Sequence, residues 1–186
     1  MVRKKDTLRT VADLLLWEPL LADGQRAALL SVPCPEKVLG VRVPQTLDAL
    51  SLEELARLWE IKTTRDLFVI GAAVLLKKGE REVLKAPVLP LLGFANMVSR
   101  ELQRIGDLWQ TIPSTHTAEE LQAGCQRLQF GVFGIADWYA RRMGIHNHDE
   151  AFATPWQRVF LCLRNDSEEA QYRKRLNDII LKQHKK

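Results

Sequence analysis

The chain has 186 residues, of which 46% are hydrophobic and 27% charged, with a formal net charge of +4. These proportions are typical of a globular protein and exclude extensive disorder, and a chain of this length buries about 70% of its unfolded surface without needing a disulfide or a metal ion. Much of the positive charge lies at the two ends rather than in a stripe along one helix. We therefore do not expect a nucleic-acid partner.

The three cysteines, Cys34, Cys125 and Cys162, are far apart and form no C-x-x-C pair. This spacing excludes a zinc ribbon and a thioredoxin-type redox site, and unpaired cysteines are typical of core positions in a reducing compartment. No apolar run is long enough to span a bilayer, and the N-terminal residues lack the apolar segment of a signal peptide. We expect a cytoplasmic protein that does not bind membranes.

Residues 1–45 have the least regular pattern. A short helix is predicted from Thr7 to about Leu16, where apolar residues recur on one face. Two short apolar runs follow, at residues 27–32 and 38–43, and they could pair as a β-hairpin. The prolines that bound both runs weigh against strands. We expect this segment to form an irregular element, made of the helix and either loops or a hairpin.

Residues 46–186 carry the signals of a mainly α fold, a multi-helix bundle. Ser51 and Glu54 form a capping box, in which the hydroxyl accepts from an early backbone N–H and the carboxylate reaches back to the cap. This box begins a short helix. Thr63 or Thr64 then caps a second helix, which ends at a glycine turn.

The longest helix is predicted from about Val88 to Trp109, because apolar residues recur there every three or four positions. Its buried face is expected to consist of Leu91, Phe94 or Ala95, Val98, Leu102, Ile105 and Trp109. A second capping box, Thr117 with Glu120, predicts another helix. That helix would continue through Leu121, Cys125 and Leu128.

The final third contains a mostly apolar segment, residues 130–143, which we expect to lie centrally in the bundle with Trp138 buried. Thr154-Pro155 is a favourable helix start, since proline at the first helical position loses no needed donor. A separate terminal helix is predicted after Asp166 or Ser167. Its apolar side is expected to carry Tyr172, Leu176, Ile179 and Ile180.

One cluster has the residue types of a metal site. His146, His148 and Asp149 lie within four positions, and imidazoles and carboxylates suit zinc or iron. Two histidines two apart in a polar loop lack the shared face of a helical H-E-x-x-H pair, and His116 would have to supply a third ligand from another loop. We interpret the cluster as a solvated turn in which Asp149 helps cap the next helix; a metal-dependent enzyme is the alternative.

No other pattern demands a reaction or a cofactor. Gly131 and Gly134 lack the remaining glycine and the preceding strand of a dinucleotide site, and are better suited to close contact between helices. Asp137 is expected to pair with Arg141 four residues later. No serine has the surroundings of a nucleophile elbow. The sequence therefore favours a non-catalytic protein that needs no cofactor.

Large aromatic side chains are the candidate partner-binding residues, because tryptophan and tyrosine are frequent anchors at interfaces. The candidates are Trp109, Trp138, Tyr139, Trp156 and Tyr172. Core packing is the alternative, and it is the favoured interpretation for most of them. The strongly charged terminal helix is either a solvated face or a docking helix for an acidic partner.

Three stretches resemble small proteins of tailed phages and prophages. Residues 46–61 (TLDALSLEELARLWEI) are similar to the start of such proteins, in which a leucine-serine or leucine-threonine step precedes a short helix. Residues 130–144 (FGVFGIADWYARRMG) and 154–176 (TPWQRVFLCLRNDSEEAQYRKRL) resemble the C-terminal part of tail-assembly-chaperone-like proteins, notably those of Bacteroidetes phages. The resemblance covers residues 46–176.

The resemblance implies a cytoplasmic protein of the bacterial host cell that holds apolar segments of a tape-measure or tail-tube protein in solution before the tail assembles. In such a protein, a helical groove lined by leucine and tryptophan could receive an amphipathic helix through anchors at positions i, i+3, i+4 and i+7. A head–tail connector or neck protein, which could be homo-oligomeric, is the structural alternative. A DNA-binding regulator ranks behind the metal-dependent enzyme.

Overall fold

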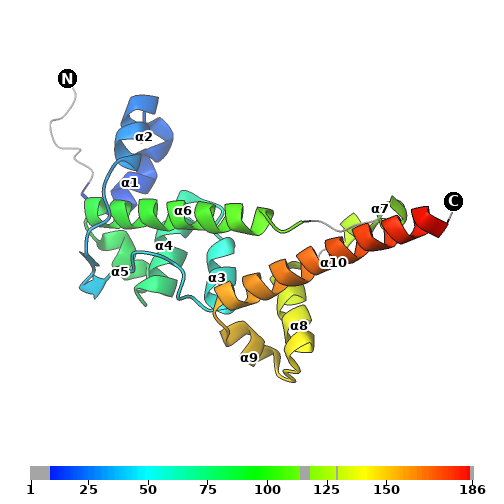
Figure 1. Ribbon diagram of the computed structural model, residues 1–186. Coiled ribbons are helices and arrows are strands. Elements are labelled where there is room, and N and C mark those ends of the chain that lie inside the picture. Colours follow the sequence, from blue (N-terminus) through cyan, green and yellow to red (C-terminus); the bar gives the residue numbers. More distant parts are fainter. Residues whose placement is uncertain (1–8, 114–117, 129, 185–186) are drawn as a thin grey trace. The chain divides into compact units, whose positions relative to one another are not determined.

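The computed structural model describes residues 9–113, 118–128 and 130–184. Within these ranges the protein is mainly α-helical with one small antiparallel hairpin, as the sequence predicts (Figure 1). The elements in chain order are α1 (Val11–Trp17), η1 (Glu18–Leu20), α2 (Asp23–Leu30), β1 (Lys37–Val38), β2 (Val41–Arg42), α3 (Leu52–Trp59), α4 (Thr64–Leu75), α5 (Glu80–Lys85), α6 (Val88–Gln110), α7 (Ala118–Gln122), η2 (Cys125–Arg127), α8 (Gly131–Met143), α9 (His148–Ala153) and α10 (Trp156–His184).

The chain divides into two compact units. Unit 1 combines the residues up to Leu47 with Ala56–Arg104, and unit 2 combines Asp48–Leu55 with the residues from Ile105 onward. Each unit is therefore built from two separate stretches of chain. The division runs through α3 and α6, whereas the sequence alone predicts a boundary after residue 45.

The core of unit 1 surrounds the first half of α6. Every residue from Leu91 to Val98 is buried, so this part of α6 is enclosed on all sides rather than along the single face that its spacing predicts. The other buried residues of this core are Val11, Leu14, Val38, Val43, Phe68, Ala72, Leu76, Val83, Ala86 and Val88. They lie in or directly after α1, the hairpin, α4 and α5, and at the start of α6.

Two capping boxes fix where helices begin in unit 1. Thr63 caps α4, and its N–H donates to Asp66 Oδ2 at 3.0 Å while its hydroxyl accepts from the Asp66 N–H at 3.1 Å. Thr10 and Asp13 form the same arrangement at α1. As a result α1 begins at Val11, and the predicted start at Thr7 lies outside the described residues.

The small N-terminal hairpin does form, but not by the possible pairing of residues 27–32 with residues 38–43. Most of the run at residues 27–32 lies in α2, and β1 instead pairs with β2 through a turn at Leu39 and Gly40. Both turn residues have positive φ, 50° and 79°, which a tight antiparallel turn requires. The strands are only two residues each, in keeping with the flanking prolines.

Side chains of α6 hold the segment after α2. The Asn96 Nδ2 atom donates to the carbonyl oxygens of Leu29 at 2.9 Å and Val32 at 3.2 Å. One turn earlier, a Cβ atom built at Gly93 would lie 2.0 Å from the carbonyl oxygen of Pro33. The backbone at this point therefore packs directly on α6, where only glycine leaves enough room.

Unit 2 is organised around the first turns of α10. The N–H of Leu52 donates to the carbonyl of Thr154, and the N–H of Trp156 donates to the carbonyl of Leu50, which joins the start of α3 to the start of α10. The Phe160 ring lies 6.2 Å from the Trp156 ring and 5.6 Å from the Trp109 ring. The buried residues here are Leu52, Leu55, Ile105, Ala136, Tyr139, Ala140, Ala151, Trp156, Val159 and Phe160.

Helix α8 is not central, contrary to the expectation for residues 130–143. It buries one narrow face, which includes Tyr139, while Phe130, Phe133 and Met143 are exposed. Trp138 is only half-buried because it faces away from that side. The apolar composition of this segment therefore reflects surface aromatic residues in addition to core residues.

The predicted terminal helix is not separate: α10 runs unbroken from Trp156 to His184 and is the longest described helix. Neither Asp166 nor Ser167 caps a new helix. Asp166 accepts from Arg142 Nε at 2.9 Å, and the Ser167 hydroxyl donates to the carbonyl of Pro113 at 2.6 Å. Because tertiary partners take up both side chains, they do not compete for the backbone of the helix.

The predicted helix through residues 121, 125 and 128 is also divided. It forms the short helix α7 and the 3-10 turn η2, because Gly124 adopts a positive φ of 84° between them. Cys125 therefore lies in η2 rather than in an α-helix. Thr117, the expected cap, lies outside the described residues.

Candidate protein-binding surfaces

The histidine loop of the sequence joins α8 to α9. Asn147, not Asp149, caps α9: its side chain accepts from the Asp149 N–H at 2.9 Å, and Asp149 lies in the first turn of the helix. The His148 Nε2 atom is 3.1 Å from Asp137 Oδ1, and its ring stacks on Phe133 with centroids 5.1 Å apart. These contacts hold the start of α9 against α8.

The metal-site candidates are not brought together. His146 is exposed, and the imidazole of His148 is engaged by Asp137. His116 lies outside the residues that the structure describes. Over the described part of the chain, no group of three His, Cys, Asp or Glu side chains is positioned to hold a metal ion.

Charged side chains of α8 form ion pairs within the helix and with α10. Asp137 pairs with Arg141, which confirms the predicted contact between residues four apart. Arg142 donates to both carboxylate oxygens of Asp166 on α10, and this hydrogen bonding raises the pKa of the Arg142 guanidinium. The charged side chains of α8 therefore have structural roles in joining neighbouring helices.

The five aromatic candidates differ in their exposure. Tyr139 and Trp156 are each 1% exposed, so their rings belong to the core and are not available as surface anchors. Trp109 and Trp138 are half-buried, and Trp109 packs edge to face against Phe160. Tyr172 alone of the five is well exposed, at 58%. The core alternative therefore accounts for the two largest buried rings.

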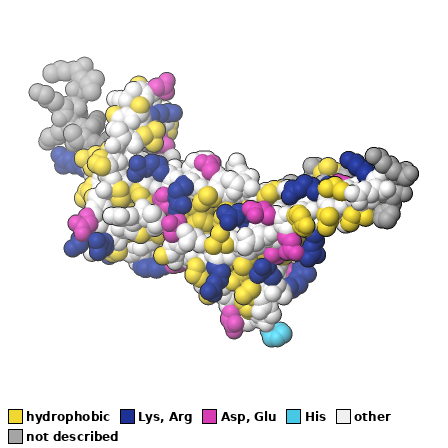
Figure 2. All heavy atoms as spheres, in the orientation of Figure 1, with side chains coloured by type: hydrophobic (Ala, Val, Ile, Leu, Met, Phe, Trp, Pro, Cys, Tyr) yellow, Lys and Arg dark blue, Asp and Glu magenta, His cyan; other side chains and the backbone are white. Residues whose placement is uncertain are grey.

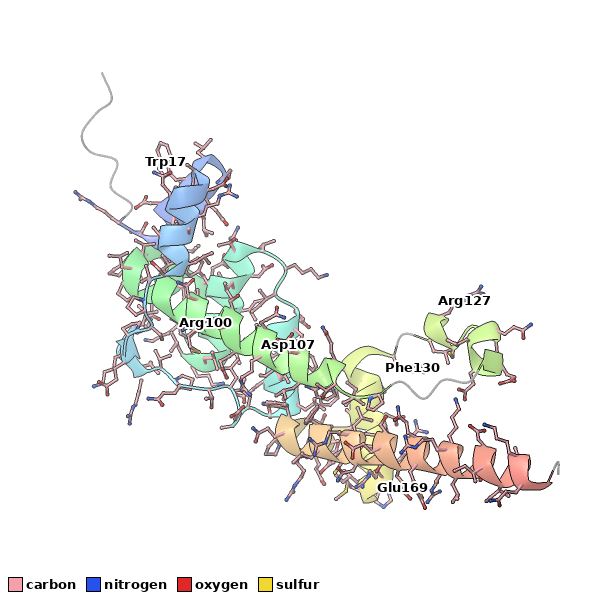
Figure 3. All side chains as sticks on the ribbon, turned by 45° about the horizontal axis from the view of Figure 1, so that its top comes forward. Trp17, Arg100, Asp107, Arg127, Phe130 and Glu169 are labelled. Carbon is pink, nitrogen blue, oxygen red and sulfur yellow. The ribbon has the colours of Figure 1, made fainter. Side chains whose placement is uncertain are left out.

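Unit 1 contains a groove of about 750 Å³ that was not among the sites predicted from the sequence. One wall is the outer side of α1 and the other is the start of α4, and a leucine of α5 contributes to the lining. Its lining residues are Ala12, Leu15, Leu16, Glu18, Lys62, Thr63, Thr64, Arg65 and Leu84. Leu16 is 75% exposed, and Trp17 at the end of α1 is also accessible (Figure 3).

Polar contacts fix the α4 side of this groove. The Thr64 hydroxyl donates to Glu18 Oε1 at 2.5 Å, which links η1 to the first turn of α4. Arg65 pairs with Glu80, and this hydrogen bond raises the pKa of the guanidinium. The side chain of Lys62 has no ion-pair partner among the described residues. The groove thus has an apolar wall of leucines opposite a polar wall whose hydrogen bonds are already formed.

A second apolar surface lies on the distal half of α10. Every residue from Tyr172 to Gln183 is exposed. Figure 2 shows hydrophobic side chains beside dark blue Lys and Arg along this helix. The large apolar residues are Tyr172, Leu176, Ile179, Ile180 and Leu181.

One sequence pattern indicates that a leucine of the groove is exposed. Leu14, Leu15 and Leu16 are consecutive, and three successive positions cover about 200° of a helix, which is wider than one buried face. Leu14 is buried, so Leu16 is necessarily directed elsewhere. For Lys62, Arg65 and Leu84 no local pattern gives such a signal, because tertiary packing alone brings them beside α1.

None of the described helices combines the length and the apolarity needed to cross a lipid bilayer. Comparisons with protein-family models, with curated proteins and with solved structures find no significant match to this chain.

Proposed function

We propose that the protein is a non-catalytic binding protein of phage or prophage assembly, a tail assembly chaperone that receives an apolar helical segment of a tail protein. The observation that carries this proposal is the leucine-lined groove of unit 1. The resemblance of residues 46–176 to tail-assembly-chaperone-like proteins supplies the class of partner.

The groove has the chemistry that an amphipathic helix requires. Leu15, Leu16 and Leu84 offer apolar contacts, and a helix binds such a surface through side chains at i, i+3, i+4 and i+7. An apolar side chain as exposed as Leu16 gains most from being covered, because burying a leucine fully is worth about 1.5–3 kcal/mol.

The opposite wall favours binding without rearrangement. Thr63 and Asp66 already form the two hydrogen bonds of the capping box, and the Thr64 hydroxyl already donates a hydrogen bond to Glu18. An incoming segment therefore leaves these hydrogen bonds intact. A preformed surface loses less conformational entropy on binding than one that must order itself.

Co-expression with the tape-measure protein of the same phage or prophage tests this function. We expect the tagged protein to bind the tape-measure protein and to increase its soluble fraction. Leu16→Asp should reduce the recovered complex by about tenfold or more, because a charge would then face the apolar segment. Leu30→Asp is the matched control, since Leu30 is similarly exposed but does not line the groove.

Other recoveries would contradict the proposal. A portal or connector protein in place of a tail protein would favour the neck alternative. If Leu16→Asp and Leu30→Asp reduced the recovered complex equally, the groove would not be the binding surface. Stoichiometric metal that is lost on His148→Ala would revive the metal-dependent enzyme.

A further inference from the structure

We infer that the distal half of α10 is a docking arm for an amphipathic helix of a partner protein whose apolar face is flanked by carboxylates. We define the docking arm as residues 170–184. All of its residues from Tyr172 to Gln183 are exposed, and Ile179 is 54% exposed. The arm lies in unit 2, so it is a different surface from the groove of unit 1.

Four of the five large apolar residues of the docking arm form a stripe, and the fifth, Leu181, lies on the opposite side of the helix. Tyr172, Leu176 and Ile179 are four and three positions apart, which places them one above another on a helix, and Ile180 adjoins them. A stripe of this width is typical of the seam between two helices. Apolar residues spaced for a partner helix and left exposed indicate that such a helix covers them.

The docking arm is also strongly cationic. It carries Arg173, Lys174, Arg175 and Lys182 against one carboxylate, Asp178. At about 100° per residue, Arg175 and Lys182 lie along one edge of the apolar stripe and Arg173 lies along the other. Both edges of the seam therefore present positive charge, at the positions where helix pairs select their partners electrostatically.

The positive charge of the docking arm favours an acidic partner helix over a second copy of this chain. A second copy of the chain would bring one cationic arm against another, and like charges at the edges of a seam oppose pairing. Carboxylates at the edges of a partner helix would instead pair with Arg173, Arg175 and Lys182. Arg173 now pairs with Glu169 in its own helix, an exposed contact of the kind that a partner can replace at little cost.

Helix stability gives a second reason for a partner. The docking arm has 15 residues, and an isolated helix of about 12–15 residues is only marginally stable in water. The arm is joined to the packed start of α10, which supplies the nucleus for the helix. Binding a partner helix would bury the stripe and stabilise the turns of the arm, whose residues from Tyr172 to Gln183 are all exposed.

Two synthetic peptides test the inference on the full-length protein. Both are fluorescein-labelled helices of about 20 residues with leucine at i, i+3, i+4 and i+7; one has glutamate at the edges of its apolar face and the other has lysine there. Fluorescence anisotropy measures their binding. We expect the acidic peptide to bind at least about tenfold more tightly than the basic peptide, by a margin that salt reduces.

Variants assign the binding to the docking arm. Ile179→Asp should abolish binding of the acidic peptide, and Arg175→Glu/Lys182→Glu should reverse the preference toward the basic peptide. Lys37→Glu/Lys85→Glu makes the same change in net charge on exposed residues of unit 1, and it should leave binding unchanged. Circular dichroism checks that each variant retains its helical content.

Three results of the peptide experiment would overturn the inference. They are no binding of the acidic peptide at about millimolar concentration, equal binding of both peptides, and binding that Ile179→Asp leaves intact. A homodimer in sedimentation that Ile179→Asp dissociates would assign the stripe to a second copy instead. If these peptides do not bind, the proposed function of the groove in unit 1 still stands, because its own test uses Leu16→Asp and the tape-measure protein.

Discussion

The side-chain amide of Asn96 donates a hydrogen bond to the carbonyl oxygen of Leu29, at 2.9 Å, from a helix position surrounded by apolar residues. Asn96 is the buried polar side chain of the described core. Because the same Nδ2 atom also reaches Val32, it satisfies two backbone carbonyls at the end of α2. A single polar side chain thus positions the N-terminal segment on α6.

Asn96→Ala should destabilise unit 1. The substitution leaves the carbonyls of Leu29 and Val32 without these partners, and a lost buried hydrogen bond of this kind costs about 1–3 kcal/mol. Urea unfolding followed by circular dichroism measures the change. Ser99→Ala, at an exposed position one turn further along α6, is the control and should change stability little. Equal stability of both variants would contradict the structural role of Asn96.

Gly93→Ala and Gly106→Ala should have opposite effects. A Cβ at Gly93 meets the Pro33 carbonyl at 2.0 Å, whereas nothing lies within 4 Å of one at Gly106. Overpacking of this kind costs about 1–3 kcal/mol, while alanine in an open helix position adds about 0.5–1 kcal/mol of stability. Thermal unfolding of the two variants gives the comparison. A Gly93→Ala protein as stable as the wild type would show that the segment at Pro33 can move away.

Tyr139→Ala should be far more destabilising than Trp138→Ala. Tyr139 is 1% exposed and Trp138 is half-buried, and removal of a fully buried aromatic ring costs about 3–5 kcal/mol. From the sequence alone, that cost was expected at Trp138. Denaturant unfolding of both variants decides the order. A larger loss for Trp138→Ala would mean that α8 buries a different face.

Acid should destabilise unit 1 through three carboxylates, of which Asp66 and Asp13 belong to capping boxes and Glu101 does not. The hydrogen bond with the Thr63 side chain and that from the Lys62 N–H lower the pKa of Asp66, and the Thr10 backbone and hydroxyl lower that of Asp13. Hydrogen bonding to Arg104 lowers the pKa of Glu101, which also accepts from the Leu47 N–H at 3.0 Å.

The sign of this dependence follows from the direction of the shifts. A carboxyl whose pKa is lower in the folded protein stabilises it above the unfolded pKa of about 4, and this stabilisation is lost as the pH falls through the folded pKa. Unfolding measured from neutral pH downward should therefore show falling stability below about pH 4. Asp66→Asn should be less stable at neutral pH and lose less on acidification. Identical acid profiles for the two proteins would contradict this role of Asp66.

Local sequence signals predict the fold class, the starts of α3 and α4, and the extent of α6. These are local properties: a capping box is complete within four residues, as Thr63 and Asp66 illustrate, and apolar periodicity is carried by the helix that it describes. The Asp137–Arg141 pair was predictable for the same reason, because helix geometry alone sets its spacing.

Which apolar residues are buried depends on packing between helices, which local signals do not encode. Tyr139 and Trp138 are neighbours of similar chemistry, and the packing of α8 in unit 2 determines that the first is buried and the second half-exposed. The unbroken course of α10 depends on Arg142 and Pro113, which engage Asp166 and Ser167 from more than 20 positions away. Such contacts join residues distant in sequence, so no local pattern encodes them, and the groove beside α1 arises in the same way.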